Sequence, residues 1–185
     1  MSALVLALAG TDHHPFDRLV EWMDVAATRR TDVRFVVQHG SAPPPRVAEG
    51  HAFLTHDVMV GLIEQSSVVV CHGGPGTIMD ARDAGRVPVC MPRDPRLGEH
   101  VDDHQQRFVA VVGAVGLVRP VGTLEVLLAE LDGGLAEGLH EREPATIDGT
   151  RQAARARAAA ELDHLMSVRI PRPRRHRPTL LSGPM

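Results

Sequence analysis

Short apolar runs alternate with segments of helical apolar spacing along most of this chain, and the alternation limits the folds that it can adopt. The runs lie at residues 3–9, 33–37, 67–71, 87–91 and 117–118. They are rich in Val, Leu and Ala with little polar interruption, which is typical of strands buried on both faces. Strands separated by helices form parallel sheets. We therefore predict an α/β fold with an open parallel sheet and helices on both faces.

Proline, glycine and threonine mark the predicted helix boundaries. A helix is expected to begin near Pro15, and a second is expected to follow Thr55 as its N-cap. The residues 43–45 are three prolines, which exclude a regular element there. A helix after the third long apolar run should end at Gly85, and the last helix should cover about 123–131.

The 185 residues have room for one sizeable core. We predict one α/β domain over 1–148 and a basic C-terminal tail, helical or disordered, over 149–185. The tail is first rich in Arg and Ala and then interrupted by prolines, so it either solubilises the chain or touches an acidic surface. The formal net charge is −3, which gives no general attraction to nucleic acid, and we expect no nucleic-acid partner.

The two cysteines, Cys71 and Cys90, each lie in an apolar run and form no CxxC pair. A reducing compartment is the simpler interpretation. The opening run of residues 1–10 lacks a basic start and is too short to span a bilayer. The sequence therefore predicts a cytoplasmic protein, which could reach the inner face of the membrane through a partner.

Two loops after predicted strands carry the chemistry. The segment 72–77, HGGPGT, follows one strand and opens a helix, so its backbone N–H groups and the positive helix end would face an anion. Gly10 and Thr11 end the first strand and precede another helix. Ligands of open α/β sheets bind at the carboxyl ends of the strands, where both loops lie. The alternative for either loop is a tight structural turn.

The segment 68–108, VVVCHGGPGTIMDARDAGRVPVCMPRDPRLGEHVDDHQQRF, resembles the donor-binding signature of glycosyltransferase family 28 and its two-subunit relatives. The opening GTDHHPFDRLVEWMD resembles the start of the bacterial soluble subunit of such enzymes. Together the resemblance covers about residues 3–120. It implies a Rossmann-like domain equivalent to the C-terminal half of a GT-B glycosyltransferase.

The resemblance also implies site residues. Asp80, five positions before Gly85, would bind the ribose hydroxyls; otherwise it is a solvated helix residue. Glutamine at position 105 would hold the donor sugar; otherwise it belongs to a polar first helical turn. His72 would contact a phosphate or sugar hydroxyl, or simply cap its strand. The family's architecture implies a catalytic base on the acceptor-binding half, and His13, which would project near the cleft from the first loop, is the local candidate. The remaining expected contacts are Gly10, Thr11, Gly73, Gly74, Gly76 and Thr77 around the diphosphate, and Asp103, His104 and Gln106 beside the sugar.

The implied function is transfer of a hexosyl group, such as N-acetylglucosamine or glucuronic acid, from a UDP-sugar to a polyprenyl-linked saccharide. The chain has about half the length of a two-domain enzyme, so a membrane-associated acceptor-binding subunit is expected. No Asp-x-Asp motif is present, and His100 and His104 lack an obvious third ligand, so neither a metal nor a cofactor is expected.

Three alternatives come from other classes of protein. A non-catalytic regulatory or scaffolding subunit would retain the fold and bind nucleotide weakly. A nucleotide-sugar epimerase would need a second domain and its own acid and base within one chain. A dinucleotide-dependent oxidoreductase would need Gly-x-Gly-x-x-Gly after the first strand, which the sequence around Gly10 does not supply.

Overall fold

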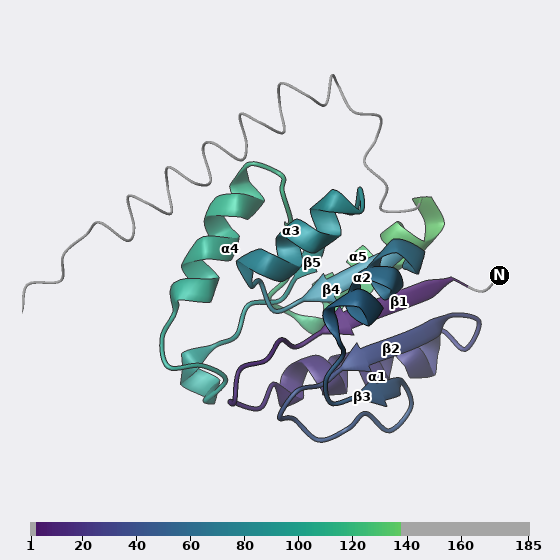
Figure 1. Cartoon of the computed structure of the whole chain (residues 1–185), viewed down its shortest axis with the longest axis horizontal. Coiled ribbons are helices and arrows are strands. Elements are labelled where there is room, and N and C mark those ends of the chain that lie inside the picture. Colours follow the sequence, from purple (N-terminus) through teal and green to yellow (C-terminus); the bar gives the residue numbers. More distant parts are fainter. Residues whose placement is uncertain (1–2, 138–185) are drawn as a thin grey trace, which may run out of the picture. The chain divides into compact units, whose positions relative to one another are not determined.

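The computed structural model describes residues 3–137, which form a parallel sheet between two layers of helices (Figure 1). All strand pairs are parallel, and the strand order is β3-β2-β1-β4-β5-β6. The strands are β1 (Leu4–Leu8), β2 (Arg34–Gln38), β3 (Glu49–His51), β4 (Val68–Cys71), β5 (Val89–Cys90) and β6 (Arg119–Pro120). This order reverses between β1 and β4, as in doubly wound nucleotide-binding folds.

The helices divide between the two faces of the sheet. Successive strand side chains point to opposite faces, so each layer of helices covers every second strand residue. On one face α1 (Asp17–Arg29) and α5 (Leu124–Glu137) cover the odd-numbered residues of β1. On the other face α2 (His56–Gln65), α3 (Pro75–Asp83) and α4 (His104–Ala114) cover the even-numbered ones. A short 3-10 turn, η1 (Pro95–Leu97), precedes α4. The open parallel sheet with helices on both faces is therefore confirmed.

The predicted strands at the centre of the sheet are correct, and the errors lie at its edges. The strand β3 was not predicted, because Glu49–His51 is short, polar and exposed, and an edge strand pairs on one side only. The last strand lies at Arg119–Pro120 and not at 117–118 as predicted. Val118 is apolar because it is buried against the helices, whereas the hydrogen bonds to β5 are made by the two residues around Pro120.

The proposed domain boundary at residue 148 and the tail 149–185 lie outside the described residues. Within residues 3–137 no helix is both long enough and apolar enough to cross a membrane.

Candidate functional site

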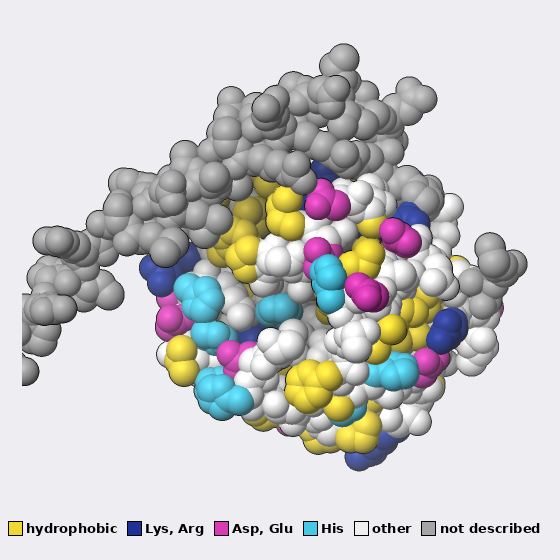
Figure 2. Space-filling model, in the orientation of Figure 1, with side chains coloured by type: hydrophobic (Ala, Val, Ile, Leu, Met, Phe, Trp, Pro, Cys, Tyr) yellow, Lys and Arg dark blue, Asp and Glu magenta, His cyan; other side chains and the backbone are white. Residues whose placement is uncertain are grey.

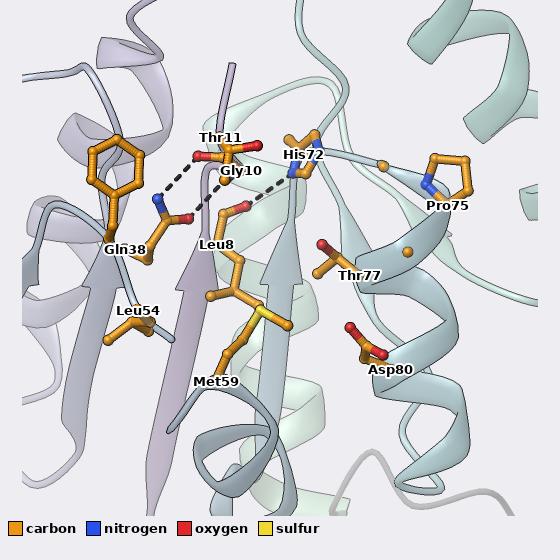
Figure 3. A pocket seen from close by; sticks show the side chains of 13 residues that line it. Leu8, Gly10, Thr11, Gln38, Leu54, Met59, His72, Pro75, Thr77 and Asp80 are labelled. Carbon is orange, nitrogen blue, oxygen red and sulfur yellow. Dashed lines mark hydrogen bonds between the residues drawn. The ribbon is translucent and has the colours of Figure 1, made fainter. Parts of the chain in front are cut away.

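A pocket opens at the carboxyl ends of β1 and β4, where the strand order reverses (Figure 3). Its volume is about 330 Å³, within the range of about 300–1,000 Å³ that is usual for small-molecule sites. The ends of β1 and β2, the loops after β1 and β4, the loop before α2, α2 itself and the first turns of α3 supply its walls. The lining residues are Leu8, Gly10, Thr11, Gln38, Phe53, Leu54, Met59, His72, Gly74, Pro75, Gly76, Thr77 and Asp80.

The walls of the pocket differ in polarity. Leu8, Leu54 and Met59 form an apolar side below the strand ends, and Phe53 is 60% exposed at its rim. On the opposite side, Thr77 and Asp80 extend from α3 toward the cavity (Figure 3). Such a pocket can bind a flat apolar group on one side and accept hydrogen bonds from hydroxyl groups on the other.

The β4–α3 loop is built around the His72 imidazole. A Cβ atom on Gly10 would lie 2.6 Å from His72 Cε1, and one on Gly74 would lie 2.3 Å from His72 Nε2. His72 Nδ1 lies 3.3 Å from the Leu8 carbonyl, to which it can donate. Burial lowers the pKa of His72 to about 4, so the ring is neutral at pH 7. Gly10 and Gly74 therefore make room for the histidine, in addition to any ligand.

Two further glycines in this loop have different surroundings. Gly73 has a φ of +88°, and a Cβ atom there would lie 2.4 Å from Val109 Cγ2, so packing requires a glycine. Gly76 has no heavy atom within 4 Å of the position of its missing Cβ, and it lies in the first turn of α3 beside the pocket. The helix begins with Pro75, and the unpaired N–H groups of its first turn suit an anion.

The β1–α1 loop is held from β2 by the Gln38 amide. Gln38 Oε1 accepts from the Gly10 N–H (3.0 Å), and Gln38 Nε2 donates to the carbonyls of Gly10 (3.0 Å) and Ala52 (2.9 Å). Gln38 is only 5% exposed. Its three hydrogen bonds fix the backbone at Gly10 and orient Thr11 at the edge of the pocket (Figure 3).

The same loop is also held by Arg93, which lies in the segment after β5 and is 1% exposed. The Arg93 guanidinium donates to the carbonyls of Ala9 (2.8 Å), His14 (2.8 Å) and Glu99 (2.9 Å). Burial lowers the pKa of Arg93, while the charges of Glu99 and the nearby Asp12 oppose that shift. The Glu99 carboxylate in turn accepts from Arg18 at 2.7 and 2.9 Å. This network joins the β1–α1 loop to the segment that follows β5.

The family model for the glycosyltransferase family 28 C-terminal domain matches residues 5–162, which is most of the chain. The chain belongs to this family. No curated protein matches.

Several solved structures share the fold of this family 28 domain. The glycotransferase of kitacinnamycin matches with a TM-score of 0.58 and 22% identity, over 88% of this chain and 43% of that one. The calicheamicin glycosyltransferase CalG4 matches with a TM-score of 0.54 and 17% identity, over 89% of this chain and 43% of that one. The glycosyltransferase VinC in complex with dTDP matches with a TM-score of 0.50 and 16% identity, over 73% of this chain and 34% of that one. The chain thus spans less than half the length of these proteins, and its Rossmann-like sheet corresponds to the C-terminal half of a GT-B fold.

The structure brings one group of the predicted site residues together around the pocket at the ends of β1 and β4. These are the seven residues Gly10, Thr11, His72, Gly74, Gly76, Thr77 and Asp80. Gly73 belongs to the same loop but faces Val109. The residues 10–11 and 72–80 lie far apart in the sequence, and the parallel sheet brings them together at the carboxyl ends of β1 and β4.

The other predicted residues do not line the pocket. Asp103 and His104 are exposed at the start of α4, and Asp103 pairs with Arg107 at 3.0 Å. Gln105, the expected sugar contact, is 7% exposed, and its side-chain oxygen lies 3.4 Å from the Arg93 backbone nitrogen. Gln106 is half-buried on α4.

His13 also lies outside the pocket lining, although it follows Thr11 closely on the β1–α1 loop. Its side chain is 84% exposed. The residue is therefore accessible to a molecule that approaches the strand ends from outside.

Sequence reasoning missed the side of the pocket that faces α2. Gln38, Phe53, Leu54 and Met59 were not predicted as lining residues. The one available signal was an aromatic and a leucine in the loop before α2, in a chain with only four phenylalanines, one tryptophan and no tyrosine.

Proposed function

We propose that this chain is the donor-binding half of a glycosyltransferase that uses a nucleoside-diphosphate sugar. The observation that carries the proposal is the pocket itself. The N-terminus of α3, the Asp80 carboxylate and an apolar wall face one cavity at the strand-order reversal. These features suit the diphosphate, the ribose and the base of one nucleotide, respectively.

The diphosphate would bind between the two loops. The N–H groups at Gly76 and Thr77 in the first turn of α3 would donate to one phosphate, and the Thr77 hydroxyl could add a further hydrogen bond. Gly10 and Thr11 would face the diphosphate from the β1–α1 loop. His72 is neutral at pH 7, so it would act as a hydrogen-bonding group and not as a charge.

The nucleoside would lie across the pocket between α2 and α3. Asp80 would accept hydrogen bonds from the two ribose hydroxyls, because a carboxylate can bind vicinal hydroxyls with short, strong bonds. Phe53, Leu54 and Met59 would pack against the base. We propose UDP as the nucleotide from the family resemblance, and the similar structure with dTDP bound makes dTDP the direct competitor to test.

The sugar would extend from the diphosphate toward the start of α4, where we propose contacts from Asp103, His104, Gln105 and Gln106. An acceptor hydroxyl would attack the anomeric carbon, forming the new C–O bond as the bond to the diphosphate oxygen breaks. The hydroxyl proton would pass to a general base, for which His13 is the local candidate. The positive end of α3 would stabilise the charge that develops on the departing diphosphate.

The acceptor site would lie on a second domain or subunit, since related structures are more than twice as long as the part that this chain matches. We propose a membrane-associated partner and a polyprenyl-linked saccharide acceptor, on the basis of the family resemblance. An arrangement of this kind would place the chain at the cytoplasmic face of the membrane.

Calorimetric titration of the chain with UDP, dTDP and ADP, without added metal, tests the proposal. UDP should bind selectively, and Asp80→Asn should lower the affinity for UDP by about tenfold, because a charge-assisted hydrogen bond is lost. Asp57→Asn is the matched control, because Asp57 is an exposed carboxylate on α2 that does not line the pocket.

The alternative is a non-catalytic subunit that retains the fold, and the same titration separates the two. Absence of binding by a folded chain, both alone and with an acceptor-binding partner, would favour the non-catalytic subunit. Equal weakening by Asp80→Asn and Asp57→Asn would show that the nucleotide does not bind as proposed.

A further inference from the structure

A buried ion pair joins α1 to the segment that leads from β5 to α4. Arg18, the second residue of α1, donates from Nε and Nη2 to the two carboxylate oxygens of Glu99, at 2.9 and 2.7 Å. The side chains of Arg18 and Glu99 are 19% and 6% exposed. The two residues are 81 positions apart in the sequence, so the pair connects two segments that meet only in the folded chain.

Further hydrogen bonds hold both the side chain and the backbone of Glu99. Its Oε2 accepts a second hydrogen bond, from the Asp94 N–H at 2.7 Å, and its backbone carbonyl accepts from Arg93 at 2.9 Å. Arg93 also donates to the His14 carbonyl in the β1–α1 loop, at 2.8 Å. Glu99 is therefore tied to α1 directly and to the β1–α1 loop through Arg93.

The Arg18 guanidinium is fixed from several directions. Its Nη2 also donates to the Pro92 carbonyl at 3.0 Å. Its central carbon lies 5.5 Å from the centre of the Phe16 ring and 5.3 Å from that of Trp22. A guanidinium within about 6 Å of an aromatic ring is attracted to the ring face. Arg18 can therefore hold the Glu99 carboxylate at one defined place.

Glu99 is one of two buried residues that enclose the exposed start of α4. The other is Gln105, whose Oε1 lies 3.4 Å from the Arg93 backbone nitrogen. Residues 101–104 lie between the two and are exposed. Figure 2 shows histidines gathered at the surface where α4 begins. The position of this polar surface thus depends on where Glu99 and Gln105 are held.

A buried ion pair contributes geometry more than stability. Both charges lose their hydration on burial, and well-packed apolar side chains of the same volume often stabilise a fold equally well. A bidentate pair between an arginine and a carboxylate is directional, so it specifies how the two groups are oriented. The contribution expected of Arg18 and Glu99 is therefore a defined position of the segment before α4 relative to α1.

We propose that Arg18 and Glu99 are positioning residues for the donor sugar, which set the place of residues 103–106 relative to the two loops at the diphosphate. The inference rests on the proposed function, in which the sugar extends from the diphosphate toward the start of α4. Neither side chain lines the pocket, so neither contacts the proposed nucleotide site. Removal of the ion pair should therefore weaken binding of the sugar and leave binding of the nucleotide nearly unchanged.

Calorimetric titration of the full chain with UDP, UDP-N-acetylglucosamine and UDP-glucuronic acid tests the inference. Glu99→Gln keeps the shape of the side chain and removes its charge. It should lower the affinity for at least one of the two UDP-sugars by about tenfold, and the affinity for UDP by less than about twofold. Arg18→Lys, which keeps the charge and loses the two-pronged geometry, should give the same pattern.

Glu49→Gln is the matched control, because Glu49 pairs with Arg34 at the same distance of 2.7 Å but at the exposed edge of the sheet. It should leave all three affinities unchanged. The double variant Arg18→Lys with Glu99→Gln should lose no more UDP-sugar affinity than the weaker-binding single variant, since the pair acts as a unit. Circular dichroism and the urea midpoint show that each variant is folded. The fluorescence of Trp22, the only tryptophan of the chain, reports on the surroundings of Arg18.

The comparison of UDP with the UDP-sugars separates this inference from the proposed function. Equal weakening of UDP and UDP-sugar binding in a folded variant would overturn the inference, because the pair would then support the whole site. Unchanged affinity for both UDP-sugars would overturn it as well. In both cases, UDP binding by the wild-type chain would leave the proposed function standing. Absence of UDP binding by the folded wild-type chain would count against the proposed function and this inference together.

Discussion

The two loops that form the diphosphate side of the pocket reach their conformations by different means. The β4–α3 loop is shaped by steric fit, because Gly73 and Gly74 leave room for Val109 and for His72. The β1–α1 loop is shaped by polar contacts from two distant segments, namely Gln38 at the end of β2 and Arg93 in the segment after β5. The β4–α3 loop therefore depends on glycines that leave space for neighbouring side chains, and the β1–α1 loop depends on buried polar side chains that bind its backbone.

This difference decides how each loop tolerates change. A steric fit fails when an atom is added and can be restored by removing another atom nearby. A buried polar contact fails when a donor is removed, because the carbonyls that it served remain buried without a partner. Mutations in the two loops should thus differ in how much stability they remove and in whether a second mutation can restore it.

The largest effect is expected from Arg93→Met. The substitution removes the donors to the backbone carbonyls of Ala9, His14 and Glu99. The Glu99 side-chain carboxylate keeps its hydrogen bonds from Arg18. Unsatisfied buried carbonyls cost about 1–3 kcal/mol each, so the free energy of unfolding should fall by about 3–5 kcal/mol in urea. Arg96→Ala, at a side chain that is 84% exposed, should change it by less than about 0.5 kcal/mol. Similar losses in both variants would contradict the proposed role of Arg93.

A pH-dependent loss is expected next, from His72. Its pKa is about 4 when folded, below the ordinary 6.5, so the unfolded chain binds more protons between these values. This contribution to stability is intact above pH 6.5 and is lost as the pH falls toward 4, by about 3 kcal/mol. Urea denaturation at pH 7, 5.5 and 4 should show that His72→Gln removes this part of the pH dependence. An unchanged pH profile in the variant would contradict the assignment to His72.

Gly74→Ala should destabilise the β4–α3 loop by about 1–3 kcal/mol, because the new methyl group overlaps the His72 ring. The sharper test is the pair of substitutions. In Gly74→Ala combined with His72→Ala the overlap is gone, so the double variant should be more stable than the sum of the single effects predicts. Strict additivity in a thermal or urea double-mutant cycle would show that the histidine does not set the requirement for glycine.

The smallest effect on stability is expected at Gly76. A methyl group there meets no heavy atom within 4 Å, so Gly76→Ala should leave stability unchanged or raise it by up to about 1 kcal/mol through helix propensity. The same methyl would extend into the space proposed for the diphosphate, and UDP affinity should fall by about tenfold or more. Melting temperature and calorimetry on one sample measure both effects, and undiminished UDP binding would place the diphosphate elsewhere.

The contrast between the loops also explains what sequence reasoning could predict. The β4–α3 loop is encoded locally: an apolar strand, the glycines and Pro75 all lie between residues 68 and 76. Its place at the sheet edge was therefore predictable, together with the fold around it. The contacts of Gln38 with Gly10 and of Arg93 with His14 join residues far apart in the chain, so no local sequence pattern predicts them.

The same limit applies at the edges of the sheet and of the pocket. The strand Glu49–His51 is defined by pairing with β2 and not by an apolar pattern, so it could not be recognised beforehand. Phe53 and Met59 become pocket residues only because that strand carries the chain back to the strand ends. The position of Gln105 under Arg93 likewise follows from tertiary packing that its sequence neighbours do not specify.

The amide of Gln38 acts as one more peptide unit in the sheet. Its nitrogen and oxygen make the paired bonds that a backbone group would make, and they join Gly10 to Ala52 beyond the last paired residues of the strands. The Gln38 amide thus continues the hydrogen bonding between neighbouring segments one step past the last paired strand residues, and the same residue lines the pocket. Asparagine would be one methylene too short to reach these groups, and glutamate would lack the two N–H donors, so position 38 needs a glutamine to hold Gly10 at the pocket wall.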